Sequence, residues 1–259
     1  MTLRWEPDLD ALIVKDLHKN FGGLEALDGV SFSVEERSIV GLIGPNGSGK
    51  TTLFNVVTGF HPTDKGEVYF YGERLTGLKP FEIPRKGLGR TFQITRVFPR
   101  MTVLENMLVS PREQVGEDFL SVFVKREAVN KQESNLTNEA LGLLRFLEIE
   151  KLKDEYAASL SGGQLKLLEL GRILMAHPKM ILLDEPVAGV NPTLARKIFD
   201  RILKLRERGV TFLIVEHNMD VVMSFCDKIH VMNKGQIVAE GSPEEIQNND
   251  QVVEIYLGG

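Results

Sequence analysis

Two kinds of apolar pattern alternate along this chain and predict an α/β fold. Uninterrupted apolar runs indicate strands buried on both faces, and apolar positions that alternate with polar ones indicate strands with one exposed face. The first pattern occurs at residues 38–43, 180–183 and 210–215, and the second at 30–34, while residues 12–14 form a further short predicted strand. A glycine-bounded strand at 66–72 and a hairpin at 229–239 complete the predicted strands.

Helices are predicted between these strands. The expected ranges are 51–57, 165–176 and 193–208. From Pro99 to Leu160 the chain becomes mostly helical, and Thr102–Glu105 has the sequence of a capping box. We therefore predict a helical insert of roughly 60 residues, with boundaries good to a few positions.

Composition excludes several classes of protein. The net charge of −5 gives no sign of a general nucleic-acid surface. The single cysteine, Cys226, cannot form an internal disulfide, and its apolar surroundings favour a core residue over a nucleophile. Because no apolar run approaches the ~18–20 residues that span a bilayer and no signal core begins the chain, we expect a cytoplasmic protein that docks on a membrane partner.

The most informative stretch is Gly44–Thr51, which fits the phosphate-binding pattern G-x-x-x-x-G-K-[ST]. It follows a predicted buried strand and opens a predicted helix, so backbone N–H groups and the helix dipole would converge on an anion. Lys50 would reach the outer phosphates, and the Thr51 hydroxyl would face Mg²⁺. The alternative is a chance glycine turn before a helix.

Acidic and imidazole side chains follow two of the buried strands. Asp184 and Glu185 end one strand, and His217 comes soon after the strand at 210–215. Ligands of α/β proteins bind at this carboxyl edge. We expect Asp184 to hold Mg²⁺ through water, Glu185 to orient or deprotonate the attacking water, and His217 to donate to the γ-phosphate. The alternatives are solvated strand-end acids and a hydrogen-bonded loop histidine.

Two weaker signals lie on either side of the phosphate loop in the sequence. Phe21 stands beside two glycines on a predicted loop, where its ring could stack on a purine or tuck against a strand. Gln93 ends a short polar and aromatic run, where its amide oxygen could bind Mg²⁺ or the attacking water, or could simply end a strand.

Leu160–Gln164 forms a second glycine turn before a helix, with Ser161 as the expected cap. Unless the fold brings it to the Gly44–Thr51 loop, this turn would hold the phosphate of a second molecule. Two such sites favour a dimer with nucleotide between its subunits.

In this order, the motifs resemble the ATP-binding subunits of ATP-binding cassette (ABC) transporters. The resemblance implies a P-loop NTPase core with an antiparallel β subdomain and an inserted α-helical subdomain, in segments 1–95, 96–160 and 161–259. It implies a head-to-tail dimer that closes on two ATP, with Mg²⁺. The implied nucleotide-binding residues are Phe21, Gly44, Pro45, Asn46, Gly47, Ser48, Gly49, Lys50, Thr51, Thr52, Gln93, Ser161, Gly163 and Gln164. Those implied for metal are Thr51, Gln93 and Asp184, and those for catalysis are Lys50, Glu185 and His217.

A narrower resemblance is to the ATPases of branched-chain amino acid importers, through residues 89–93, 98–106 and 184–192. It implies transmembrane permease partners, a substrate-binding protein acting indirectly, and a peripheral location on the cytoplasmic face of the inner membrane. Many family members carry Asp where this chain has Asn191, and basic residues where it has Leu167-Leu168.

The permease would contact the helical insert, with Phe98, Arg100 and Met101 as candidate residues. The alternatives to branched-chain amino acid import are urea import, lipopolysaccharide export, a soluble ABC ATPase acting on ribosomes or DNA, and a non-hydrolysing nucleotide sensor.

Overall fold

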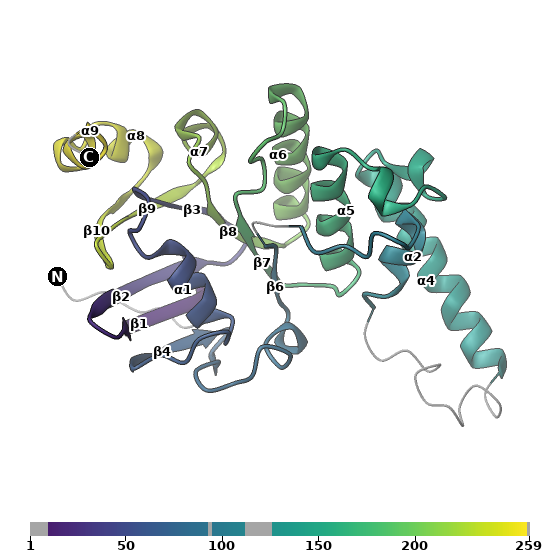
Figure 1. The fold of residues 1–259 in the computed structure, drawn as a ribbon, viewed down its shortest axis with the longest axis horizontal. Helices are drawn as coiled ribbons and strands as arrows, with labels where there is room; N and C mark the ends of the chain where they lie inside the picture. The colour runs from purple at the N-terminus through teal and green to yellow at the C-terminus, as the bar shows by residue number, and fades with distance from the viewer. Residues whose placement is uncertain (1–9, 93–94, 112–125, 258–259) are drawn as a thin grey trace. The chain divides into compact units, whose positions relative to one another are not determined.

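The computed structural model describes residues 10–92, 95–111 and 126–257. The chain divides into two compact units. The first consists of Met1–Arg90, Lys179–Pro186 and Ile202–Gly259, and the second of Thr91–Pro178 and Val187–Arg201. The α/β architecture predicted from the sequence is confirmed, with one antiparallel sheet, one mixed sheet and a set of helices (Figure 1).

The mixed sheet of the first unit has six strands in the order β10-β9-β3-β8-β7-β6. Its bounds are β3 Ile39–Ile43, β6 Leu88–Arg90, β7 Met180–Asp184, β8 Thr211–Val215, β9 Lys228–Asn233 and β10 Gln236–Gly241. Strands β3, β7 and β8 are parallel neighbours and are buried along their whole length, which is why they are continuous apolar runs. Their carboxyl ends therefore meet along one edge.

The second sheet is antiparallel, in the order β2-β1-β4-β5. Its strands are β1 Asp10–Phe21, β2 Leu24–Glu35, β4 Lys65–Phe70 and β5 Glu73–Arg74. One hydrophobic core joins both sheets to helix α1 (Lys50–Val57), with Phe32 and Leu42 from the two sheets and Phe54 from the helix fully buried.

The remaining helices are divided between the two units. Those of the first unit are α7 Met219–Phe225, α8 Pro243–Gln247 and α9 Asp250–Leu257. The second unit contains α2 Val103–Leu108, α4 Arg126–Phe146 and α5 Gly162–Leu174, and α6 Pro192–Glu207 contributes residues to both units. Within the described ranges no helix is long and apolar enough to cross a membrane.

Several predicted boundaries shift. The expected loop at Lys19–Phe21 is wrong, because β1 runs to Phe21 and pairs with β2 through a tight turn in which Gly22 has a φ of 59°. Helix α4, Arg126–Phe146, lies within the predicted helical insert. The hairpin at the end of the sheet is confirmed, with Lys234 and Gly235 both at positive φ as a two-residue turn requires.

Replacing Glu240 with glutamine should lower the melting temperature at pH 7 by about 1–4 °C. The Glu240 Oε2 atom lies 3.2 Å from Nδ1 of buried His230, which lowers the pKa of the carboxyl from 4.5 to about 2, with a smaller contribution from Lys228. A lowered folded-state pKa contributes stability above pH 4.5 that is lost as the pH falls through about 2.

The difference between the variant and the parent should accordingly shrink from pH 5 to pH 2, followed by thermal unfolding at several pH values. Glu244→Gln, at an exposed position with no ion pair among the described contacts, serves as the control. A pH-independent difference would contradict this assignment.

Candidate active site

The phosphate loop connects β3 to α1, and two of its glycines stand where no other residue fits. Gly44 has a φ of 152°, and a Cβ there would lie 2.0 Å from the Met232 carbonyl oxygen on β9. Gly49 has a φ of 106°, and its Cβ would lie 2.5 Å from the Ala26 carbonyl oxygen on β2. The loop thus packs directly against two neighbouring strands, and it can adopt this shape because Gly44 and Gly49 carry no side chain.

A backbone contact from the C-terminal hairpin also supports the loop. The Gly235 N–H, in the β9–β10 turn, donates to the Ser48 carbonyl oxygen at 3.0 Å. The Gly235 carbonyl accepts from the Asp28 N–H at 2.9 Å. The turn therefore joins the phosphate loop to β2.

Lys50 lies across the inside of this loop. Its ammonium donates to the carbonyl oxygens of Gly44 at 2.8 Å and Pro45 at 2.9 Å. Burial lowers the pKa of Lys50, and the nearby negative charges of Glu185 and Asp184 act in the opposite direction. A buried cation bonded only to neutral oxygens and facing two acids is suited to receive phosphate oxygens.

The edge of the mixed sheet brings the predicted acid and imidazole together. Asp184 ends β7 and is almost fully buried, and Glu185 follows it with a φ of 48° while its N–H donates to the Val215 carbonyl oxygen at 2.9 Å. This bend turns the carboxylate toward His217, whose Nε2 lies 2.9 Å from Glu185 Oε1. The roles of Glu185 and His217 toward a γ-phosphate and a water stay predictions.

The residues present fit a nucleotide phosphate chain and a magnesium ion. Close packing of Gly44 and Gly49 on neighbouring strands fixes the shape of the loop, and a loop of this kind before a helix directs backbone N–H groups toward phosphate. The Asp184 carboxylate and the Thr51 hydroxyl are hard oxygen donors of the kind that Mg²⁺ prefers.

Phe21 ends β1 with 43% of its surface exposed. Its ring makes an edge contact with His61, with ring centres 5.3 Å apart, and the Lys19 ammonium lies 5.4 Å from the Phe21 ring centre. His61 lies outside the helices and strands. Stacking of Phe21 on adenine stays a prediction.

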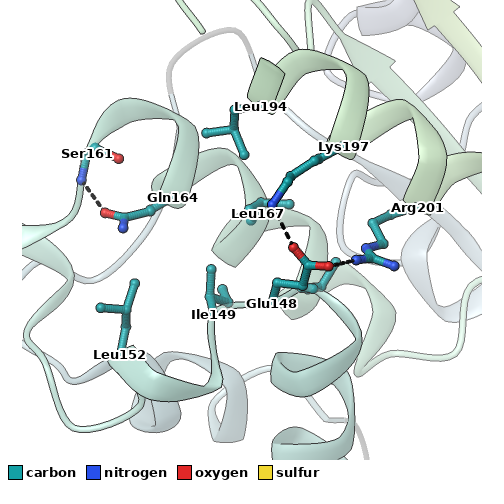
Figure 2. Close-up of a pocket in the computed structure, with 10 residues that line it drawn as sticks. Glu148, Ile149, Leu152, Ser161, Gln164, Leu167, Leu194, Lys197 and Arg201 are labelled. Carbon is teal, nitrogen blue, oxygen red and sulfur yellow. Dashed lines mark hydrogen bonds and ion pairs between the residues drawn. The ribbon is translucent and has the colours of Figure 1, made fainter. Parts of the chain in front are cut away.

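The Ser161 turn belongs to the second unit and begins α5 (Figure 2). Ser161 is the N-cap, as predicted, and its backbone N–H donates to Gln164 Oε1 at 2.8 Å. Gly163 packs so closely on α6 that a Cβ would lie 2.2 Å from Leu194 Cδ2. The turn is therefore fixed by contacts within its own unit, with Ser161 left exposed.

A cavity of about 190 Å³ lies beside this turn. Apolar side chains that include Leu152, Leu167 and Leu194 line it, as Figure 2 shows. At one side Glu148 bridges two cations of α6, Lys197 at 3.0 Å and Arg201, and these neighbours lower the pKa of the Glu148 carboxyl.

Gln93 lies outside the described residues, so its predicted role toward metal or water stays a prediction. The residues around it reveal a contact that sequence reasoning missed. Glu169 Oε1, on α5, accepts from the backbone N–H groups of Phe92 at 3.3 Å and Arg96 at 3.4 Å. Burial raises the pKa of Glu169. The sequence signal for this contact was a glutamate among the leucines of helix α5.

The candidate permease contacts lie at or near the surface of the second unit. Phe98 is 43% exposed, with the Arg172 guanidinium 4.9 Å from its ring centre, while Arg100 is exposed and Met101 is half-buried.

Asn191 stands where many members of the family carry Asp. Its Oδ1 accepts from the Leu194 N–H at 3.0 Å, so asparagine retains a capping contact at the start of α6.

Comparison with protein families gives two matches. The family described as "ABC transporter" matches residues 27–188, and the family described as "Branched-chain amino acid ATP-binding cassette transporter" matches residues 236–259.

Two curated relatives cover nearly the whole chain. A probable branched-chain amino acid transport ATP-binding protein, LivG, of Archaeoglobus fulgidus is 47% identical over 95% of this chain and 95% of its own length. The high-affinity branched-chain amino acid transport ATP-binding protein BraF of Pseudomonas aeruginosa is 41% identical over 95% of this chain and 97% of its own.

Two solved structures are also similar. A nucleotide-free ATP-binding cassette from an ABC transporter superposes with a TM-score of 0.83 at 45% identity, covering 97% of this chain and 100% of that one. A dimeric cassette in a post-hydrolysis state bound to ADP and Pi gives a TM-score of 0.74 at 26% identity, covering 90% of this chain and 98% of that one.

Proposed function

Because the chain belongs to the ABC transporter family of ATP-hydrolysing subunits, we propose that it powers the import of branched-chain amino acids. The observation that carries the cargo is the full-length similarity to LivG and BraF, together with the match of residues 236–259 to a branched-chain amino acid cassette family. Urea, the alternative import substrate, serves as the comparison cargo in the transport assay.

In the proposed mechanism the loop N–H groups and Lys50 hold the phosphates, and Glu185 takes a proton from the attacking water. His217, 2.9 Å from Glu185, orients that carboxylate and donates to the γ-phosphate. Asp184 and Thr51 would hold Mg²⁺, which when bound neutralises charge on the phosphate oxygens. The support is the placement of Lys50, Asp184, Glu185 and His217 within one unit, with Glu185 and Asp184 close enough to act on the Lys50 ammonium.

The opposing subunit of a head-to-tail dimer would complete each site with Ser161, Gly163 and Gln164. The exposed position of Ser161 at the start of α5 is consistent with this role. ATP then favours the closed dimer because only closure adds these contacts, and hydrolysis removes that preference. A related cassette is dimeric with ADP and Pi.

The cycle is proposed to act on permease subunits at the cytoplasmic face of the membrane. Phe98, Arg100 and Met101 would meet the permease, and a substrate-binding protein would deliver cargo on the far side. The exposed ring of Phe98 and the exposed Arg100 support this surface.

The test is to purify the chain with the membrane subunits that accompany it and to reconstitute the assembly in proteoliposomes. We expect ATP-dependent uptake of labelled leucine, isoleucine and valine, and no uptake of urea. The same assembly with Glu185→Gln is the control and should not accumulate cargo. Uptake of urea, or ATP turnover indifferent to branched-chain amino acids and their binding protein, would refute the assignment of cargo.

A further inference from the structure

Arg90, which was not singled out in the sequence, links three parts of the first unit. It ends β6 with its side chain 7% exposed. Its Nη1 donates to Asn55 Oδ1 and to Thr58 Oγ1, both at 2.8 Å. Its Nη2 lies 3.6 Å from Asp184 Oδ2. One guanidinium therefore joins the end of β6, the second half of helix α1 and the end of β7.

The surroundings of this guanidinium favour a single orientation. Its central carbon lies 5.5 Å from the ring centre of Phe54 and 5.8 Å from that of Phe60. Asp184 is 4% exposed, so both charges of the pair lie where water contributes little. Opposite charges attract more strongly in such surroundings, and a buried charge that loses its partner is costly.

We propose that Arg90 is a positioning residue for the nucleotide site, which fixes the Asp184 carboxylate relative to helix α1. That helix begins with Lys50 and Thr51, so Arg90 sets the separation between the proposed metal carboxylate and the phosphate-binding groups. The inference rests on the proposed metal role of Asp184. Arginine is required because lysine, a single ammonium, lacks the fork of donors that reaches both α1 and β7.

A thermal double-mutant cycle tests the charge pair without nucleotide or activity. Arg90→Met should lower the melting temperature by roughly 6–15 °C, because it leaves the buried Asp184 charge without its partner. Adding Asp184→Asn should recover at least half of that loss, since the uncompensated charge is then gone. If the double variant showed the sum of the two single changes in melting temperature, the charge pair between Arg90 and Asp184 would be refuted.

Binding of a fluorescent ATP analogue with and without Mg²⁺ tests the link to the site. Without Arg90, no guanidinium would hold the Asp184 carboxylate in place beside helix α1, so the proposed metal ligand would lose its fixed position. Arg90→Met should therefore lose roughly 10-fold in Mg²⁺-dependent affinity for the analogue. Arg90→Lys, which keeps the cation but not the fork of donors, should lose less, and in EDTA the parent and the variants should bind alike.

Positioning is tested separately by Asn55→Ala/Thr58→Val, which keeps the charge pair but removes the contacts to α1. It should lower kcat with little change in KM. If Arg90→Met does not fold, Arg90→Met/Asp184→Asn and Arg90→Lys still test the pair. Mg²⁺-dependent affinity in Arg90→Met equal to that of the parent, with unchanged kcat in the α1 variant, would overturn the inference. If the parent protein bound the ATP analogue equally well with and without Mg²⁺, the metal role of Asp184 would be refuted instead. The thermal double-mutant cycle would still test the Arg90–Asp184 pair.

Discussion

Replacing Glu185 with glutamine should leave ATP binding within about 2-fold of the parent and reduce hydrolysis by roughly 10²–10⁴-fold. In the parent, His217 Nε2 lies 2.9 Å from Glu185 Oε1. Glutamine has the shape of glutamate and keeps an oxygen that can contact His217, but it cannot accept a proton from water. Phosphate release measures turnover, and a fluorescent ATP analogue measures binding.

The variant should also accumulate as an ATP-bound dimer, detected by light scattering after size exclusion. Closure continues while the reaction that reopens the dimer is blocked. Glu207→Gln, the same change at the exposed end of α6, is the matched control and should behave as the parent. Normal turnover in Glu185→Gln would remove Glu185 from the chemistry, and a monomer with bound ATP would count against the shared site.

Replacing Lys50 with methionine should weaken ATP binding by roughly 10- to 100-fold and abolish measurable turnover. The ammonium would make charge-assisted hydrogen bonds to phosphate oxygens, each contributing about 1.5–3 kcal/mol. Methionine has a similar length and offers neither the charge nor the donors. Titration calorimetry with ATP measures the loss directly.

Without nucleotide, the Lys50→Met variant should melt within a few degrees of the parent, because burial already lowers the pKa of Lys50 and the buried ammonium is costly. The rise in melting temperature that ATP gives the parent should be largely absent from the variant. Lys65→Met, at an exposed strand position, is the control. An undiminished ATP-dependent rise in Lys50→Met would place the phosphates elsewhere.

The parts of this molecule that could be predicted were those encoded in short stretches. The phosphate loop is one, since strand, glycines and helix start lie within a few residues. The buried strands β3, β7 and β8 are another, because burial on both faces leaves an uninterrupted apolar run. The acid pair at 184–185 and the position of His217 at the same sheet edge followed from such runs, whereas the contact between Glu185 and His217 was not predicted.

The contacts that escaped prediction depend on residues distant in sequence. Arg90 meets Asn55 and Asp184, and Glu169 meets the backbone of Phe92, through pairings that only the fold creates. Phe21 was misplaced for a different reason. The glycines after it were interpreted as part of a loop, whereas they form a hairpin turn that lets both strands continue.

The contact between Gly235 and Ser48 has a consequence for how the chain can vary. An exposed two-residue hairpin turn is ordinarily a place where a protein accepts extra residues without harm. Here the backbone of that turn is hydrogen-bonded to the phosphate loop, so its length and its glycine are constrained by a loop formed much earlier in the chain. Related chains should therefore vary freely at other surface turns while keeping the length of this one.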